Sequence, residues 1–375
     1  MIPLSPLPAS LLLLSPIAFL SASSPSASAF TSVRRPSIPS IMSQQSPRTT
    51  ERQHSLCAVQ AGYDRSTERA DAFVLPTLQE AFGKELDRYE IIGDKIIQPN
   101  AVGMRLRLPD AERGGWPEDV FLKQVLATDY VGARKDWSDL RRTLLYARTE
   151  LRFYRDILPM MNKKGFHATP KAYYAQYDFD GWIEENEHAT RPADEGVEKD
   201  NLPDASEKGG WLVLECISAD THMQDSPLSM DRAKQCLEAA AKLHASAWED
   251  GELLRKASDE LSRAAFNLQM RNPKELAGIE DAWDTFCSNF KADLEANSLR
   301  SDRVQNLGKR LKAVAEQVSR EVTPSPDAKY ATIIHGDYKA MNVMLGIAIS
   351  TPTIMIDMAS ASAGLGMSDV AMHIH

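Results

Sequence analysis

Two short apolar strands near the end of the chain constrain the fold more than any other feature. The apolar run 330–335 predicts a strand that leads directly into the sequence HGDYKAMN at 335–342. A second apolar run, 353–357, predicts another strand, and its last residue is Asp357. The pattern therefore predicts a polar loop, supported by short strands, that collects several oxygen-bearing side chains.

The residue types in this loop suit the chemistry of phosphate groups. A carboxylate at Asp337 can accept a hydrogen bond from a hydroxyl group and take its proton. The amide oxygen of Asn342 and the carboxylate of Asp357 are hard oxygen ligands of the kind that Mg²⁺ prefers. The alternative is that Asp337 and Asn342 only form and cap a turn, as these residue types often do. The apolar strand that ends on Asp357 favours the functional interpretation.

The order of elements predicts an α+β protein with two lobes. One helix is expected at 141–158, where Pro159 should end it, and helices dominate 230–322 with a break at Pro273. The first lobe is expected to be small, with an antiparallel sheet plus one helix, and the second to be mainly helical. The expected strands of the first lobe lie at 89–108, 120–125, 171–177 and 211–217.

Lobe boundaries follow from the same reading. The N-terminal lobe is expected at 77–217, with a flexible insertion at 178–210 that is rich in Asp, Glu, Gly and Pro. The C-terminal helical lobe, which carries the HGDYKAMN loop, is expected at 218–375.

The pattern HGDxxxxN, followed by an apolar strand and Asp, resembles the catalytic and metal-binding loops of aminoglycoside phosphotransferases, choline kinases and ecdysteroid kinase-like proteins, including the CHK kinase-like group. The resemblance implies a protein-kinase-like fold with ATP and Mg²⁺ as cofactors. It implies that Asp337 is the catalytic base, and that Asn342 and Asp357 bind the magnesium of MgATP.

Supporting roles are expected for three further positions. His335 would orient the loop by hydrogen bonding without reacting. Asp369, in the sequence GLGMSDVA at 364–371, would brace the loop. His244 lies in the helical segment 230–248 and is expected to pack behind the loop, neither binding a ligand nor taking part in catalysis.

In the first lobe, the resemblance implies the nucleotide contacts. Lys123 occupies the position of the strand lysine that holds the α and β phosphates, and Glu150 that of the helix glutamate that positions this lysine. A buried lysine is costly without such a partner. The alternative is an edge-strand lysine that discourages aggregation and a glutamate on a solvated helix face. The backbone around Glu215 and Ile217 resembles the hinge that contacts adenine.

Three features depart from the family pattern. The expected phosphate loop at 91–104 holds just two glycines, and the sequence MAS at 358–360 replaces the usual aromatic residue after the metal-binding aspartate. The sequence ends at His375, where relatives usually continue with helices that build the acceptor pocket. The C-terminal lobe is therefore expected to be truncated.

Composition and charge narrow the class of partner. The chain has 375 residues, of which 43% are hydrophobic and 25% charged, so it can build two lobes with their own cores. A net charge of -9 argues against nucleic acid, which usually requires a basic surface. The four cysteines are widely spaced and predict reduced structural thiols. A small soluble substrate with a hydroxyl group is the expected partner, and the oligomeric state is not indicated.

The first 50 residues have the composition of a targeting presequence. They contain no Asp or Glu, and the apolar run 11–20 is too short for a membrane span. A signal peptide is expected at about 1–29 and a transit-like segment at 30–50. The junction ASAF at 27–30 resembles that of two-part plastid presequences in diatoms and related algae. Import into a plastid, with no membrane insertion of the mature chain, is the expectation, and secretion is the alternative.

These observations leave more than one functional class open. The first is an ATP-dependent phosphotransferase that acts on a hydroxyl group of a small metabolite. The alternative is an inactive pseudokinase or nucleotide-binding interaction module, which the sparse phosphate loop and the expected truncation would favour. An aminoglycoside resistance enzyme is a weaker third option, because a plastid presequence points to housekeeping metabolism.

Overall fold

The computed structural model describes residues 72–98, 101–127, 137–183, 208–299, 301–348 and 350–374. The expected presequence and most of the expected insertion, residues 184–207, lie outside these ranges. Within them, no helix combines the length and the apolar character needed to cross a membrane.

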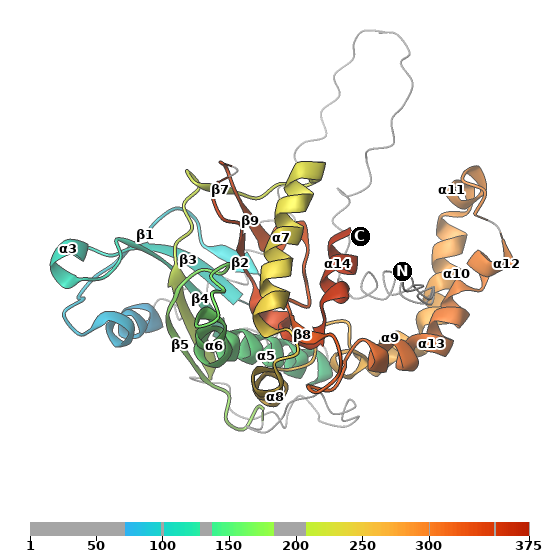
Figure 1. Ribbon diagram of the computed structural model, residues 1–375, viewed down its shortest axis with the longest axis horizontal. Helices are drawn as coiled ribbons and strands as arrows, with labels where there is room; N and C mark the ends of the chain where they lie inside the picture. Colours follow the sequence, from blue (N-terminus) through green and yellow to red (C-terminus); the bar gives the residue numbers. More distant parts are fainter. Residues whose placement is uncertain are drawn as a thin grey trace, which may run out of the picture.

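An antiparallel sheet forms the N-terminal part of the described chain (Figure 1). Its strands lie in the order β1-β3-β4-β6-β5, and β2 pairs with β3 along the same edge as β1, at residues 101–103. The short helix α3 (Ala111–Gly114) connects β3 to β4. The strands are β1 (Glu90–Ile91), β2 (Ile96–Gln98), β3 (Ala101–Arg107), β4 (Asp119–Leu126), β5 (Ala172–Asp178) and β6 (Gly209–Glu215).

Alternation along the strands explains how this sheet is buried. In β3 and β4, Met104 and Leu122 lie opposite each other and are fully buried against the helix at 72–82 and its neighbours. Lys123, the next residue along β4, points to the other face, where α5 (Trp137–Arg152) packs. The pleat of β4 therefore separates an apolar core from a charged site.

The helix that follows β4 extends further than the sequence predicts. After α5 the chain widens into a π-helical turn, η2 (Phe153–Ile157), and continues as α6 (Leu158–Asn162). The expectation that Pro159 ends the helix is therefore wrong. Pro159 lies in the first turn of α6, where its missing N–H group costs nothing because that position has no intrahelical partner.

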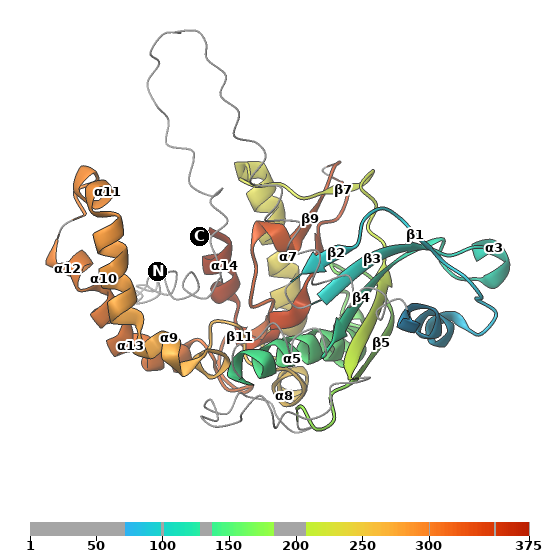
Figure 2. The same cartoon turned by 180° about the vertical axis from the view of Figure 1, so that it is seen from behind.

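The C-terminal part is mainly helical. Ser229 caps α7, and Asp250 caps α8, each by accepting a backbone N–H with its side chain. Figures 1 and 2 show α9 to α13 extending away from the sheet as an arm. The helices are α7 (Met230–Ala247), α8 (Gly251–Glu260), α9 (Pro273–Ala277), α10 (Ile279–Asn289), α11 (Lys291–Ala296), α12 (Asp302–Gln305), α13 (Leu307–Glu321) and α14 (Gly366–Ile374).

Two small sheets support the HGDYKAMN loop. β8 (Ala331–Ile334) pairs with β11 (Ser362–Leu365), and β9 (Val343–Gly346) lies between β7 (His222–Met223) and β10 (Ile354–Met355). All of these pairs are antiparallel. The predicted α+β architecture, with an antiparallel sheet followed by a mainly helical part, is confirmed, although β7, β9 and β11 were not expected.

Candidate active site

The loop that carries Asp337 begins with a glycine that no other residue could replace without strain. Gly336 follows β8 with φ of 78°, a conformation that costs free energy for residues with a Cβ atom. A Cβ atom there would also lie 2.1 Å from the carbonyl oxygen of Ser360. Because Gly336 has no side chain, its backbone can pack against Ser360 and the chain can turn directly before Asp337.

Asn342 fixes the position of Asp337 from the far end of the loop. Its Nδ2 donates to the Asp337 carbonyl oxygen at 2.8 Å and to Oδ2 of the Asp337 carboxylate at 3.0 Å. Because both bonds use the amide nitrogen, the amide oxygen is left as a possible metal ligand. Lys339 Nζ lies 2.8 Å from the same Oδ2, so Oδ1 of Asp337 is the oxygen that neither contact uses.

Lys339 is a site residue that the sequence reasoning did not single out. Its side chain is 47% exposed, so it can also reach a group outside the loop. The signal was present in the sequence, since Lys339 is the one cation inside HGDYKAMN and stands two residues after Asp337.

Asp369 holds the start of the loop from beneath. Its carboxylate accepts the backbone N–H of His335 at 2.8 Å and that of Gly336 at 2.9 Å, and Oδ2 also lies 2.9 Å from Nε2 of His244. Asp369 is 1% exposed. The α14 helix and the loop are therefore joined by charge-assisted hydrogen bonds in a buried setting. His335 itself donates from Nε2 to the Ile356 carbonyl oxygen at 2.9 Å, which ties the loop to the segment after β10.

A buried lysine connects the sheet to the C-terminal part of the chain. Lys123 Nζ lies 2.7 Å from Oε2 of Glu150 on α5 and 2.9 Å from Oδ1 of Asp357. The side chains of Lys123 and Glu150 are 10% and 6% exposed. The structure thus brings together three residues that the sequence separates widely, and charges buried to this degree require such partners.

The electrostatics of this group depend on burial and on mutual charge. Burial lowers the pKa of the Lys123 ammonium, but the carboxylates of Glu150 and Asp357 outweigh it, so the pKa lies above its usual value. The charge of Lys123 lowers the pKa of Asp357. Burial raises the pKa of Glu150, although Lys123 opposes this shift. Lys123 is therefore held as a cation and Asp357 as an anion.

Asp357 adopts a backbone conformation that is unusual for its residue type. Its φ and ψ are 63° and 59°, in the left-handed region. The preceding N–H, of Ile356, donates to the Asn342 carbonyl oxygen at 3.0 Å and so places Asp357 beside Asn342. Strain of this kind persists where surrounding contacts enforce it, and it is common at functional sites.

The donors at this point fit a magnesium ion that also binds phosphate. Two protein oxygen atoms could bind the ion: the amide oxygen of Asn342, and Oδ2 of Asp357, which Lys123 does not contact. Mg²⁺ is typically bound by one or two such ligands, with phosphate and water oxygens completing its octahedral shell. Over the described ranges, no group of three or more His, Cys, Asp or Glu side chains could hold a metal ion alone, so an all-protein metal site is not offered there.

Glu215 and Ile217 lie where the sheet connects to the C-terminal part. Glu215 is the last residue of β6, and its backbone N–H donates to the Lys171 carbonyl oxygen at 2.8 Å. Its side chain accepts the Lys171 N–H at 3.2 Å. The Glu215 amide is thus used within the sheet, which leaves the Glu215 carbonyl group and the Ile217 backbone as the groups for an adenine contact.

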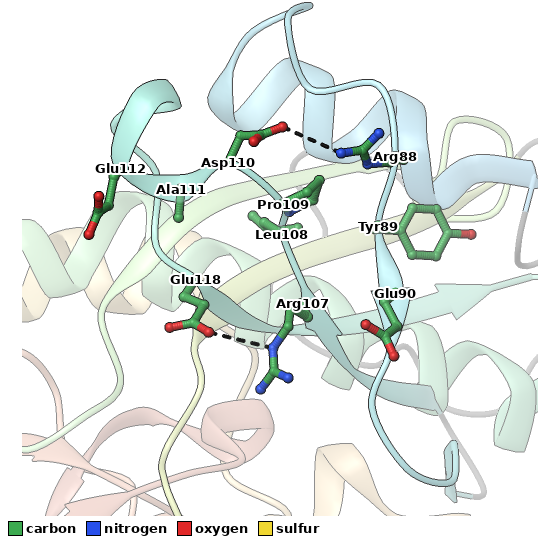
Figure 3. A pocket seen from close by; sticks show the side chains of 10 residues that line it. All are labelled: Arg88, Tyr89, Glu90, Arg107, Leu108, Pro109, Asp110, Ala111, Glu112 and Glu118. Atoms are coloured by element: carbon green, nitrogen blue, oxygen red, sulfur yellow. Dashed lines mark hydrogen bonds and ion pairs between the residues drawn. The ribbon is translucent and has the colours of Figure 1, made fainter.

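A separate open pocket lies on the outer end of the sheet and holds none of these residues (Figure 3). Its volume is about 980 Å³. Figure 3 shows that its two arginines are paired internally, Arg88 with Asp110 at 3.5 Å and Arg107 with Glu118 at 3.7 Å. This pocket therefore does not coincide with the candidate active site.

Comparisons with known proteins give one family match and several distantly similar solved structures. The family model "Ecdysteroid kinase-like family" matches residues 131–372, whereas no curated protein matches the chain. Three similar solved structures are an aminoglycoside-3'-phosphotransferase of type VIII, a putative aminoglycoside phosphotransferase from Ralstonia eutropha and the aminoglycoside phosphotransferase APH(3'')-Id from Streptomyces rimosus.

The likeness to these three structures is distant. Sequence identities are 17%, 12% and 14%, and TM-scores are 0.38, 0.39 and 0.30, in the same order. The matches cover 80%, 82% and 81% of this chain and 81%, 68% and 82% of the other chains. Because these TM-scores are low, the assignment depends on the family model, which spans more than half of the sequence. This chain belongs to the ecdysteroid kinase-like family.

Proposed function

We propose that the protein transfers a phosphoryl group from MgATP to a hydroxyl group of a small metabolite. One observation carries the proposal: Lys123 bridges Glu150 and Asp357, and Asp357 stands beside the Asn342 that fixes Asp337. A cation for phosphates, two metal ligands and a carboxylate for the acceptor are thereby gathered at one place. Membership of the ecdysteroid kinase-like family supports a small-molecule phosphotransferase in general terms.

The contacts of each residue suggest its role in binding MgATP. MgATP, when bound, supplies the phosphoryl group and the divalent cation that balances its charge. Lys123 offers its ammonium group to the phosphates, and Glu150 keeps that group in place. Asn342 and Asp357 offer the metal ligands. The Glu215 carbonyl group and the Ile217 backbone offer hydrogen bonds to adenine.

Asp337 acts on the acceptor. Since Asn342 and Lys339 both contact Oδ2, Oδ1 would accept the hydrogen bond of the acceptor hydroxyl. It would take the hydroxyl proton as the acceptor oxygen bonds to the γ-phosphorus and the bond from that phosphorus to ADP, the leaving group, breaks. Lys339 places a positive charge next to this carboxylate, where negative charge develops on the transferred group.

The test is magnesium-dependent ATP turnover with a panel of hydroxylated metabolites. We expect Asp337→Asn to lower turnover by about 100- to 10,000-fold, the usual contribution of a positioned base, while ATP binding is retained. The matched control is Asp231→Asn, because the Asp231 side chain is 94% exposed on α7. This variant should match the wild type.

A different result would favour the pseudokinase. If a thermal shift with MgATP shows binding, but no hydroxylated acceptor is phosphorylated and Asp337→Asn changes nothing, the transferase proposal is wrong. The small number of glycines in the segment 91–104 is the sequence feature that would account for this lack of activity.

A further inference from the structure

Three side chains lie along one face of α5, beginning next to Lys123 and extending away from it. Arg142, Tyr146 and Glu150 follow one another at intervals of four residues and therefore share a face of the helix. Glu150 contacts Lys123, which fixes the direction of this face. Figure 2 shows α5 running from beside the sheet toward α9. Arg142 contacts Glu275 of α9, so the end of α5 that carries Arg142 is the end next to the helical arm.

At that end, two guanidinium groups share a single carboxylate. Arg142 Nη1 lies 3.3 Å from Oε1 of Glu275, and Arg271 Nε lies 2.7 Å from Oε2. Glu275 belongs to α9, and Arg271 ends the turn before that helix. Glu275 is thus contacted by a guanidinium group from each side, one on α5 and one just before α9.

Arg271 has an unused donor. Its side chain is 8% exposed, and within the part of the chain that the structure describes its Nη2 is buried without a hydrogen-bond partner. A buried donor without a partner costs free energy that an anion could recover. Guanidinium groups bind carboxylate and phosphate oxygens in a paired geometry, so the chemistry of an incoming partner is restricted to anions.

Tyr146 lies between Arg142 and Glu150 on this face of α5. Burial raises the pKa of the Tyr146 phenol, Arg142 and Arg271 lower it, and the charge of Asp337 raises it again. The phenol is therefore close enough to Arg142, Arg271 and Asp337 to be affected by their charges. The Tyr146 hydroxyl makes no hydrogen bond to any residue that the structure describes, so it can donate to an added oxygen.

We propose that Arg142, Tyr146 and Arg271 bind an anionic group of the acceptor, a carboxylate or a phosphate ester, while the acceptor hydroxyl faces Asp337. This inference depends on the proposed function and names its substrate class. Glu275 holds the two arginines in place and competes with the bound anion for them. The acceptor is thus a hydroxylated metabolite that carries its own negative charge.

The first experiment measures anion binding without turnover. Inorganic phosphate, and acetate as the carboxylate counterpart, are titrated by calorimetry into the full chain in the presence of magnesium and a saturating non-hydrolysable ATP analogue. We expect Arg271→Gln to weaken binding about tenfold, as the loss of a charge-assisted hydrogen bond does. Glu275→Gln should tighten binding by a similar factor, since the competing charge is removed.

The opposite direction of these two changes makes the result decisive. A misfolded variant cannot bind an anion more tightly, so the Glu275 variant stays informative even if Arg271→Gln is unstable. The control is Arg255→Gln, because Arg255 forms an exposed ion pair with Asp327 at 2.7 Å on α8. Weaker or unchanged binding by Glu275→Gln would overturn the inference, because a purely structural bridge predicts that result.

The second experiment compares matched acceptors in ATP turnover. A hydroxy acid is compared with its amide, and a sugar phosphate with the free sugar, which separates a carboxylate from a phosphate ester. We expect one anionic member to be preferred about tenfold in kcat/KM over its neutral partner, with the preference reduced by Arg271→Gln. Equal use of both members would overturn the inference while leaving the transferase proposal intact. Absence of any turnover would count against the proposed function, whereas the calorimetry would still report on the anion site.

Discussion

At the scale of single residues, two backbone conformations shape the site. Gly336 takes a positive φ directly beneath Ser360, and Asp357 takes one beside Asn342. The first is open only to glycine in this setting, because of the contact with Ser360. The second is a strained aspartate that Lys123 and the Ile356 hydrogen bond hold in place.

Replacing Gly336 should damage stability and activity together. Gly336→Ala adds a Cβ atom 2.1 Å from a backbone oxygen, and we expect a loss of about 2–4 kcal/mol in the free energy of unfolding. Gly93→Ala is the matched control, since Gly93 has φ of 72° with no atom within 4 Å of the added Cβ. It isolates the backbone cost of about 1 kcal/mol. Equal losses in urea denaturation of the two variants would show that the contact with Ser360 does not matter.

At the scale of elements, α14 is joined to the HGDYKAMN loop through one carboxylate. Asp369 accepts two backbone N–H groups at the end of β8 and also contacts His244 on α7. Three elements therefore depend on a single buried side chain. Since its oxygens face donors only, an uncharged replacement that presents its own N–H group cannot satisfy them.

We expect Asp369→Asn to lower the free energy of unfolding by about 3 kcal/mol, because one amide oxygen replaces two carboxylate oxygens and an N–H group then faces backbone donors. Asp327→Asn is the control, as the Asp327 side chain is 73% exposed in a surface ion pair. Denaturation curves monitored by tryptophan fluorescence check this. A change of less than 1 kcal/mol in the Asp369 variant would contradict the bracing role.

At the scale of the whole molecule, Lys123 joins the sheet to the segment after β10, and this ion pair makes stability depend on pH. The pKa of Asp357 lies below its usual value of 3.8 because of Lys123. A carboxylate with a lowered pKa contributes stability that is present above its unfolded-state value and is lost as the pH falls through its folded-state value. The contribution of Asp357 is therefore complete near neutral pH and disappears in acid.

The difference in unfolding free energy between the wild type and Asp357→Asn should accordingly be constant from pH 7 down to about pH 4, then shrink below about pH 4. Glu150 has a pKa shifted the opposite way by burial, but it is present in both proteins, so most of its effect cancels. Urea denaturation at a series of pH values checks this. A difference that grows as the pH falls would show that Lys123 does not stabilise the Asp357 anion.

Local signals predicted much of this molecule. The apolar runs before Asp337 and Asp357 located the HGDYKAMN loop and its supporting strands, since strand patterns and turn residues act over short distances. The Arg271–Glu275–Arg142 cluster was not found, because nothing in the local sequence of either helix states that they meet. The strands β7 and β9 are short, and their pairing depends on residues far apart in the chain. Pro159 was misread because a proline in a first helical turn and one that ends a helix look alike in sequence.

The bridge made by Lys123 has a consequence for how the protein is made. Lys123 and Asp357 are 234 residues apart, so at ribosomal rates of 5–20 residues per second Asp357 is synthesised about 10 to 50 s after Lys123. Glu150 emerges early and can neutralise the lysine while the rest of the chain is still being added. The Lys123–Glu150 pair can thus form well before Asp357 exists, and the ion-pair bridge is completed only after Asp357 has been added.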